Sequence, residues 1–402
     1  MTRVLHIITR LILGGAQENT LYSALGQMRS PGIEATLCYG ADDGTEGSLV
    51  PRARAAGLPL IHEPTLCRAI APADDARCLV RLTSLMRRDR YDVVHTHSSK
   101  AGILGRVAAR LAGTPVVVHT FHSLVFHEYQ ERWKNALYVA LERMTAPLAD
   151  ALVSVNDRTT EGLLAAGVGR AEQYGTIYSG MALEQFLGVR QRLSVADAKL
   201  RLGIPADVPV VGKVARLFPL KGHAQFLDVA SALALTDARV RFLLVGGGPL
   251  RAELAADAAR RGLGDRVVFT GAVEPEAVPE AIQAMDVVVH TSLREGIARV
   301  LPQALAVGKP VVTFALDGAP EVVHPGVSGE LVGAGDTAAL AAEVRALLAD
   351  PARCTRYGEA GRGFAAANFG LPTMVARINA LYDRLLREKG RTPLDPAALR
   401  ER

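Results

Sequence analysis

Short apolar runs alternate with longer amphipathic stretches along most of the chain. Each run is rich in Val and Ile and ends at a glycine or a polar turn, and the stretch that follows repeats its apolar residues at helical spacing. Strands that alternate with helices are typical of parallel sheets. The pattern therefore predicts an α/β protein.

The predicted strands fall into two groups. The first group covers 4–9, 35–39, 59–62, 93–96, 116–120, 151–155 and 176–178, and the second covers 209–215, 240–246, 266–271, 287–291, 310–314 and 329–332. Each group is large enough for a doubly wound parallel sheet. The sequence thus predicts two Rossmann-like domains.

A polar, charge-rich stretch separates the two groups. We place a linker at 188–208, between an N-terminal domain at 1–187 and a C-terminal domain at 209–370. A helix over about 371–390 is expected to pack back on the N-terminal domain, and 391–402 to form a frayed tail. Because open α/β sheets bind ligands at the carboxyl ends of their strands, we expect the active site in a cleft where the two sheets face each other.

Composition narrows the class of protein without identifying it. The chain has 402 residues, of which 49% are hydrophobic and 22% charged, as expected for two globular domains. The net charge of +5 suits an anionic ligand but is too small to indicate nucleic-acid binding. The four cysteines are far apart and are expected to be reduced. The sequence shows neither a signal-like start nor a long apolar run. A cytoplasmic protein is therefore expected, and attachment to the inner face of the membrane stays open.

Two glycine-rich turns follow predicted strands. Gly14 and Gly15 follow the first strand, where backbone amides could approach a phosphate, although an ordinary turn explains them equally well. Gly248 lies in a second turn that resembles a dinucleotide fingerprint but has Arg251 where a third small residue is required. The second turn therefore indicates a loop of fixed backbone conformation near a nucleotide rather than a nicotinamide site.

Two cations follow the strand at 209–215. Arg216 and Lys221 could together neutralise a diphosphate, and Pro219 and Gly222 would hold their loop in one shape. A solvated basic loop is the alternative.

An acidic residue and a helix start follow the strand at 287–291. Glu295 is expected to face the ligand, and the amides of Arg299, Val300 and Leu301 could receive phosphate oxygens at the helix N-terminus. A carboxylate that merely caps the helix is the alternative for Glu295.

Taken together, these segments resemble glycosyltransferase family 4, the retaining nucleotide-sugar-dependent enzymes with the GT-B fold. The resemblance extends to about Lys389. Besides the turns and loops above, it covers 92–102, 118–122, 179–180, 268–271 and 318–323.

The resemblance implies roles for individual residues. Glu295 matches the first acid of the E-x7-E motif, which holds donor-sugar hydroxyls, and Gln303 stands in place of the second acid, which binds ribose. An amide can still accept and donate hydrogen bonds, at a loss of about 1 kcal/mol of charge assistance. His122 matches a histidine that faces the reacting sugar. The catalytic set expected is His122, Glu295, Arg216 and Lys221, and the donor-binding set is Gly14, Gly15, Gly248, Val273, Gly296, Ile297, Arg299, Val300, Leu301 and Gln303.

The resemblance also implies a mechanism in which the departing phosphate takes the proton of an acceptor attacking from the same face. The chain lacks the D-x-D motif through which other transferases hold a divalent cation, so neither a metal nor an organic cofactor is expected. Five histidines near two strand ends could suggest a metal site, but no H-E-x-x-H spacing supports one.

The acceptor is expected in the N-terminal domain. Its arginines and the segment 127–134, which contains Tyr129 and Trp133, suit a lipid-linked diphosphate at a membrane surface, although a solvated basic face is equally compatible. The leading hypothesis is transfer from a UDP-sugar, favoured by the family, to a glycan or lipid-linked acceptor. The alternatives are a UDP-sugar epimerase of the same fold and a non-catalytic nucleotide-sugar-binding protein.

Overall fold

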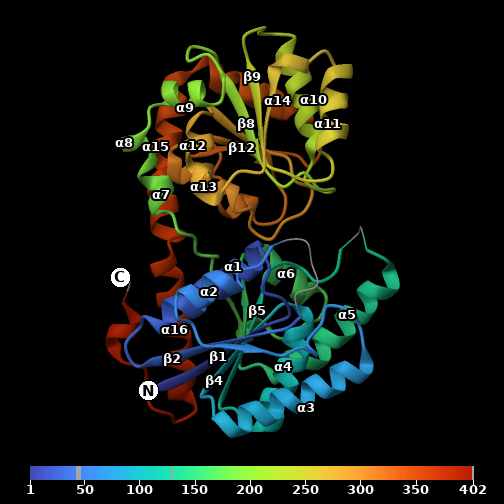
Figure 1. Cartoon of the computed structure of the whole chain (residues 1–402), viewed down its shortest axis with the longest axis vertical. Coiled ribbons are helices and arrows are strands. Elements are labelled where there is room, and N and C mark those ends of the chain that lie inside the picture. Colours follow the sequence, from blue (N-terminus) through green and yellow to red (C-terminus); the bar gives the residue numbers. More distant parts are fainter. Residues whose placement is uncertain (42–46, 128–129, 401–402) are drawn as a thin grey trace. The chain divides into compact units, whose positions relative to one another are not determined.

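The chain forms two separate parallel sheets, each with its own core (Figure 1). The computed structural model describes residues 1–41, 47–127 and 130–400. It divides into two units: unit 1 comprises 1–181 and 370–402, and unit 2 comprises 182–369.

Unit 1 is built on a seven-stranded sheet in the order β3-β2-β1-β4-β5-β6-β7. Every pairing in this sheet is parallel. Its strands are β1 (Thr2–Ile8), β2 (Ile33–Tyr39), β3 (Leu60–His62), β4 (Val93–His97), β5 (Val116–Phe121), β6 (Ala151–Ser154) and β7 (Tyr174–Thr176).

Helices cover both faces of this sheet. They are α1 (Gly15–Met28), α2 (Val50–Ala55), α3 (Pro72–Asp89), α4 (Ser99–Ala112), α5 (Arg132–Thr145), α6 (Asp157–Ala165) and α16 (Leu371–Glu388). Val4 and Val93 point into the core shared with α16, and their neighbours Leu5 and Val94 point into the core shared with α3 and α4. Because both faces are covered, β4 and β5 are buried throughout.

Unit 2 is built on a six-stranded parallel sheet in the order β10-β9-β8-β11-β12-β13. Its strands are β8 (Val210–Val214), β9 (Arg241–Val245), β10 (Val267–Gly271), β11 (Val287–His290), β12 (Val311–Phe314) and β13 (Gly329–Val332). Its helices are α7 (Glu184–Leu187), α8 (Val189–Arg192), α9 (Val195–Arg201), α10 (His223–Ala234), α11 (Arg251–Arg260), α12 (Val278–Gln283), α13 (Val300–Val307), α14 (Thr337–Ala349) and α15 (Pro351–Asn368). Buried Phe226, Phe242 and Leu340 join α10, β9 and α14 in one core.

The strand pattern read from the sequence is confirmed, since every predicted strand overlaps an observed one. Two doubly wound parallel sheets are therefore present, as the periodicity predicted.

Two predicted segments are different in the structure. The stretch 188–208 is not a linker, because α8 and α9 fold into unit 2 and bury Val189, Leu193 and Ile204. The segment after 390 is not frayed, because Leu394 and Ala398 are buried in the unit 1 core beside α16. In both segments isolated apolar residues dock against a neighbouring core, and a charged composition hides that signal.

Candidate functional site

The order of strands in unit 2 reverses between β8 and β11. The chain continues from β8 to β9 on one side and from β11 to β12 on the other, so the loops that leave β8 and β11 diverge at the carboxyl edge. Ligands of open α/β sheets bind at such a switch point. The loops at 215–222 and 291–299 therefore form the candidate donor site.

An ion pair joins these two loops. Lys221 Nζ lies 2.5 Å from Glu295 Oε1, and both side chains are partly exposed. The loops are also joined through their backbones, because Leu293 N donates to Leu220 O over 2.9 Å. The sequence analysis assigned Lys221 and Glu295 to one site, and the structure brings them into contact.

Gly222 makes the close approach of the two loops possible. Its φ of +64° lies in the left-handed region, and a Cβ there would lie 1.7 Å from the carbonyl oxygen of Thr291. That carbonyl is backbone, so it cannot swing away like the end of a flexible side chain. Thr291 also donates from Oγ1 to Gly222 O over 2.5 Å. Only glycine fits at this position.

Asp317 holds the backbone of the acidic segment. Its Oδ2 accepts a hydrogen bond from Glu295 N at 2.5 Å, and Gly318 N donates to Gly296 O at 3.0 Å. The loop after β12 thereby fixes the direction of Glu295. The sequence analysis did not identify Asp317, although an acidic residue just after a buried strand was a signal for it.

Lys213 lies beneath the ion pair and was also not identified. It is 0% exposed on β8, and its Nζ donates to Thr291 Oγ1 over 2.9 Å. Burial lowers its pKa to about 7; Glu295 opposes this shift and Lys221 adds to it. A single charged residue inside an apolar strand was the sequence signal for it.

Two neighbouring histidines are neutral. Burial lowers the pKa of His223 to about 4 and that of His290 well below its usual value. His223 donates from Nε2 to Arg216 O over 3.0 Å. The positive charge of the candidate site is therefore carried by lysine and arginine side chains.

Three more of the predicted site residues, Arg216, Gly248 and Val273, follow β8, β9 and β10. The Arg216 guanidinium carbon lies 5.1 Å from the centre of the Phe218 ring, and the side chain is exposed. Gly248 has a φ of +154°, and a Cβ there would lie 2.5 Å from Leu217 O, so the second turn requires glycine. Val273 follows β10 and is partly exposed.

The start of α13 differs in part from the expectation. Leu301 N already donates to Ala298 O over 3.0 Å, so its amide is not available to a phosphate as predicted. A tightened first turn uses that donor internally. Arg299 is the N-cap residue and Val300 the first residue of the helix. Gln303 is partly exposed on α13, in the first turns of the helix.

Gly296 and Ile297 complete the donor-binding residues expected beside α13. Gly296 offers its carbonyl to Gly318, as described above, and Ile297 is buried. Both therefore shape the segment between Glu295 and the helix.

In unit 1 the predicted residues lie near the carboxyl ends of β1 and β5. Gly14 is the N-cap of α1 and Gly15 its first residue; Glu18 N donates to Gly14 O over 2.8 Å.

His122 follows β5 directly and is partly exposed; its Nε2 lies 3.2 Å from Nδ1 of His97. Burial lowers the pKa of His122 to about 4, so its imidazole is neutral at physiological pH.

His122 borders a cluster of buried histidines. The ring nitrogens of His6, His95 and His97 include three atoms within 4.8 Å of one another, a spacing at which a metal could be considered. His95 lies between Tyr382 Oη at 2.6 Å and Thr120 Oγ1 at 2.7 Å, so both of its nitrogens already have partners.

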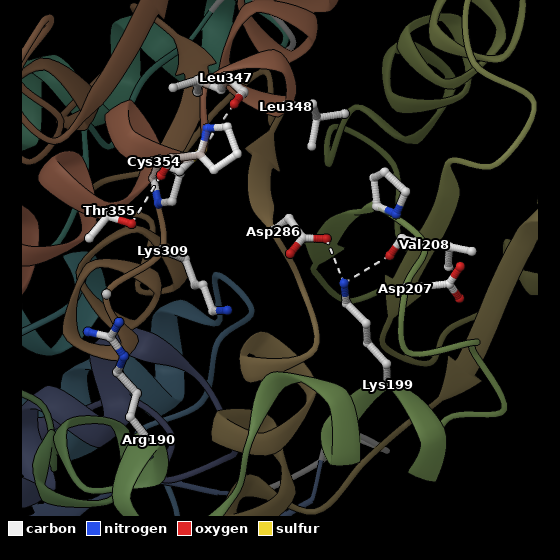
Figure 2. A pocket seen from close by; sticks show the side chains of 14 residues that line it. Arg190, Lys199, Asp207, Val208, Asp286, Lys309, Leu347, Leu348, Cys354 and Thr355 are labelled. Atoms are coloured by element: carbon white, nitrogen blue, oxygen red, sulfur yellow. Dashed lines mark hydrogen bonds and ion pairs between the residues drawn. The ribbon is translucent and has the colours of Figure 1, made fainter.

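A cavity of about 370 Å³ lies at the opposite edge of the unit 2 sheet (Figure 2). It is lined by residues that precede β8, β11 and β12, among them Asp286 and Lys309. Figure 2 shows Lys199 donating to Asp286 Oδ2 and Val208 O, each over 2.8 Å. Because this cavity faces the amino ends of the strands, it is separate from the Lys221 and Glu295 site.

The predicted acceptor surface is only partly basic. Arg81 pairs with Glu63, and Arg88 pairs with Asp89, so neighbouring carboxylates offset these charges. Trp133 on α5 is 60% exposed, whereas Tyr129 lies outside the described residues. Among the described residues, no helix combines the length and apolar character that crossing a membrane requires.

Two family models match the chain, one in each unit. The model "Glycosyl transferase 4-like domain" matches residues 14–178, and "Glycosyl transferases group 1" matches residues 196–364.

Curated relatives match most of the chain. A 2-deoxystreptamine glucosyltransferase from Streptomyces kanamyceticus is 31% identical over 77% of this chain and 82% of its own length. A D-inositol 3-phosphate glycosyltransferase from Catenulispora acidiphila is 32% identical over 85% of this chain and 87% of its own length. An Escherichia coli enzyme named UDP-Gal:alpha-D-GlcNAc-diphosphoundecaprenol alpha-1,3-galactosyltransferase is 32% identical over 63% of this chain and 66% of its own length.

Solved structures share the fold. HepE from Anabaena, crystallised with UDP and glucose, superposes with a TM-score of 0.79 at 23% identity, covering 95% of this chain and 99% of that one. Sucrose-phosphate synthase from Thermosynechococcus elongatus superposes with a TM-score of 0.74 at 24% identity, covering 96% of this chain and 100% of that one. With its two parallel-sheet units and these relatives, the chain belongs to the group 1, family 4 type glycosyltransferases of the GT-B fold.

Proposed function

We propose that this glycosyltransferase moves a sugar from a UDP-sugar to a glycan or lipid-linked acceptor, with retention of anomeric configuration and without a metal ion. The observation that carries the proposal is the Lys221 and Glu295 pair, 2.5 Å apart at the switch point of the unit 2 sheet. A cation and a carboxylate side by side suit a ligand that has both a diphosphate and a sugar.

The chemistry explains why both charges are needed. Breaking the bond between sugar and diphosphate builds negative charge on the leaving phosphate and positive charge on the anomeric carbon. Lys221, together with Arg216, would stabilise the phosphate in place of a metal ion. Glu295 would accept hydrogen bonds from sugar hydroxyls, and Asp317 would keep it correctly directed by holding its backbone amide.

Lys213 fits the same picture. A diphosphate bound above it would favour the protonated ammonium, because an opposite charge raises the pKa of a lysine. Binding of the donor would then add positive charge beneath the ion pair. Loss of the diphosphate as product would remove that stabilisation.

The UDP part of the proposal is supported by proteins that this chain resembles. HepE has been crystallised with UDP and with UDP-glucose, and the name of the Escherichia coli relative specifies UDP-Gal. In this chain Gln303 would meet the ribose, donating to one hydroxyl and accepting from another. We therefore expect nucleotide binding to persist despite the missing carboxylate.

The acceptor part of the proposal is supported by a relative and by unit 1. The Escherichia coli enzyme is named for a diphosphoundecaprenol-linked acceptor. Exposed Trp133 on α5, with Lys134 Nζ 5.3 Å from its ring centre, provides an amphipathic feature of the type found at membrane surfaces. We propose that unit 1 binds the acceptor, in contact with the inner face of the membrane where that acceptor is lipid-linked.

Donor hydrolysis without an acceptor tests this proposal. The purified protein would be incubated in EDTA with UDP-glucose, UDP-galactose, UDP-N-acetylglucosamine or GDP-mannose, and the anomeric proton signals would be followed by NMR. We expect slow hydrolysis of one UDP-sugar, with the sugar first released as the anomer present in the donor. Glu295→Ala should abolish it, and Glu359→Ala, which removes a surface carboxylate of the same unit, should not.

Three results would contradict the proposal. Activity that requires an added divalent cation would exclude the metal-free mechanism, and first release of the opposite anomer would exclude retention. Conversion of a UDP-sugar into its epimer would instead place the protein among the epimerases.

A further inference from the structure

A continuous row of buried hydrogen bonds leads through unit 1 to His122. It begins at the carbonyl oxygen of Ala398 and passes through Asn379 on α16, Gln27 on α1, His6 on β1 and His97 on β4. The four side chains before His122 are 0% exposed. The successive distances are 2.7, 3.1, 2.7, 3.0 and 3.2 Å. Residues from four separate elements, the loop after β5 and the C-terminal segment thus form one connected path.

The start of the row fixes the direction of the first two amides. A backbone carbonyl can only accept, so Asn379 must direct Nδ2 toward Ala398 O. Nδ2 also donates to Ser30 Oγ over 3.2 Å, and Ser30 uses its own proton on Gly26 O. Asn379 Oδ1 therefore faces Gln27, which must donate from Nε2 and present Oε1 on its other side.

The same logic fixes the histidines in turn. Gln27 Oε1 can only accept, so His6 must carry its proton on Nε2. A neutral His6 then has a lone pair on Nδ1, which accepts from Nε2–H of His97. His97 is left with a lone pair on Nδ1, which accepts from Nε2–H of His122. A neutral His122 is thereby left with its lone pair on Nδ1.

All three imidazoles are neutral, as this reasoning requires. Burial lowers the pKa of His6 and His122 to about 4 and that of His97 well below its usual value. The row ends on an amide and a backbone carbonyl, neither of which can take up a proton at physiological pH.

The geometry favours a hydrogen-bonded row over a metal centre. The rings of His95 and His97 are stacked, with centres 4.3 Å apart and planes inclined by 29°. The rings of His6 and His97 have centres 5.3 Å apart and planes inclined by 22°, a side-by-side arrangement that suits the in-plane hydrogen bond between them. A metal requires lone pairs that converge in the planes of the rings, and the stacked rings of His95 and His97 direct theirs nearly parallel. The hydrogen-bonding groups of the row are neutral imidazoles, amides, the Ser30 hydroxyl and a backbone carbonyl. A metal dication buried among them would have no anion in the row to balance its charge.

We propose that Asn379, Gln27, His6 and His97 are positioning residues that hold His122 as the Nε2–H tautomer, so that its Nδ1 accepts a hydrogen bond from a hydroxyl of the sugar. This inference deepens the proposed function, because it rests on His122 contacting the transferred sugar. His122 then acts as a fixed, uncharged acceptor. No group in the row can accept a proton passed on from His122. His122 therefore orients a hydroxyl and does not act as a general base that passes the proton on through the row.

NMR of the full-length protein with 15N-labelled histidine tests the tautomers without any substrate. Long-range proton to nitrogen correlations distinguish protonated from unprotonated ring nitrogens, and His122→Gln assigns the signals of His122. At pH 7 we expect His6, His97 and His122 all to carry the proton on Nε2. Protonation of His122 at Nδ1 would overturn the proposal, and so would a transition metal retained in one-to-one ratio by the purified protein.

Two variants test whether the row sets the tautomer. Gln27→Glu places a carboxylate against His6; this should make His6 an imidazolium that donates from Nδ1, reverse His97, and leave His122 with its proton on Nδ1. Gln27→Met removes the anchor without adding charge and should give a mixture of both tautomers of His122. Thr120→Val is the control, because it removes a hydroxyl partner of His95 and leaves the row intact. If His122 keeps its proton on Nε2 in both Gln27 variants, the row does not position it.

Activity separates this inference from the proposed function. Gln27→Met should lower kcat/KM for donor hydrolysis by about tenfold, as expected for one misdirected hydrogen bond, with the circular dichroism spectrum unchanged. A Gln27→Met protein with mixed tautomers and wild-type kcat/KM would overturn the role assigned to His122 Nδ1. If the wild-type protein hydrolyses no donor, the proposed function fails, while the tautomers still show whether the row fixes His122.

Discussion

Replacing Lys213 with methionine should stabilise the protein at neutral pH. A charged group is normally excluded from a buried strand, yet Lys213 is fully buried on β8 and has one hydrogen bond, to Thr291. Methionine has a similar length and no charge, so it should fill the same space. A residue retained at the expense of stability is typical of a functional site, where a local rule of folding is broken.

The magnitude follows from the pKa of Lys213. A fall from 10.5 in the unfolded chain to about 7 in the folded protein corresponds to a cost of about 5 kcal/mol for the protonated form. Between these two pKa values the unfolded state binds more protons than the folded state, so the stability of the wild type rises with pH, by about 1.4 kcal/mol per pH unit. Below pH 7 both states are protonated and the full cost persists. Loss of the hydrogen bond to Thr291 subtracts about 1 kcal/mol, so the variant should be more stable by about 4 kcal/mol at pH 6.

Urea unfolding from pH 6 to pH 9.5 measures this difference. The advantage of Lys213→Met should be constant up to about pH 7 and then shrink as pH rises. Lys309→Met provides a matched comparison, because burial lowers the pKa of Lys309 only to about 8, and the smaller advantage should begin to shrink about one pH unit higher. A Lys213→Met protein that is less stable than the wild type at pH 6, or a difference that does not vary with pH, would refute the reasoning.

Three further predictions concern other parts of the fold. Arg106 and Glu142 form a fully buried ion pair at 2.5 Å, so Arg106→Met should lower the free energy of unfolding by about 3–5 kcal/mol, and adding Glu142→Met should restore part of that loss in urea titrations. A double-variant loss equal to the sum of the two single-variant losses would show that the pair is not coupled. Gly222→Ala should lower the melting temperature and weaken UDP binding, because its Cβ would collide with Thr291 O; an unchanged variant would contradict the close approach of the two loops. Leu394→Ala should cost about 2–4 kcal/mol in the same titrations, whereas a frayed C-terminal segment would lose almost nothing.

The sheets could be predicted because their signal is local. Runs of Val such as those at β5 and β12 identify buried strands without knowledge of their neighbours. Lys221 and Glu295 could be predicted in the same way, because each follows such a strand within a few residues. The linker and the tail were misassigned because single apolar residues such as Leu193 and Leu394 decide their docking.

The rest of the site depends on contacts between distant segments. Asp317 acts on a backbone amide 22 residues away, and no pattern in the sequence encodes that pairing. The row that ends at His122 joins residues as far apart as Gln27 and Asn379, which are separated by 352 positions. The charge of Lys213 stands out from the apolar pattern of its strand, but its role depends on Thr291 and Glu295, which are distant in the sequence.

Calorimetric titration with UDP in EDTA tests the central claim most directly, because it needs neither the correct sugar nor the acceptor. The claim is that Lys221 and Glu295, at the carboxyl ends of β8 and β11, mark a site for a nucleoside diphosphate. UDP should bind the wild-type protein without a metal ion, and Lys221→Met should weaken binding at least tenfold, as expected for a lost charge-assisted contact. Arg239→Met, which removes an exposed cation near the opposite end of the sheet, should bind as the wild type does. Equal affinity for the wild type and Lys221→Met, or no binding of UDP at all, would contradict the account.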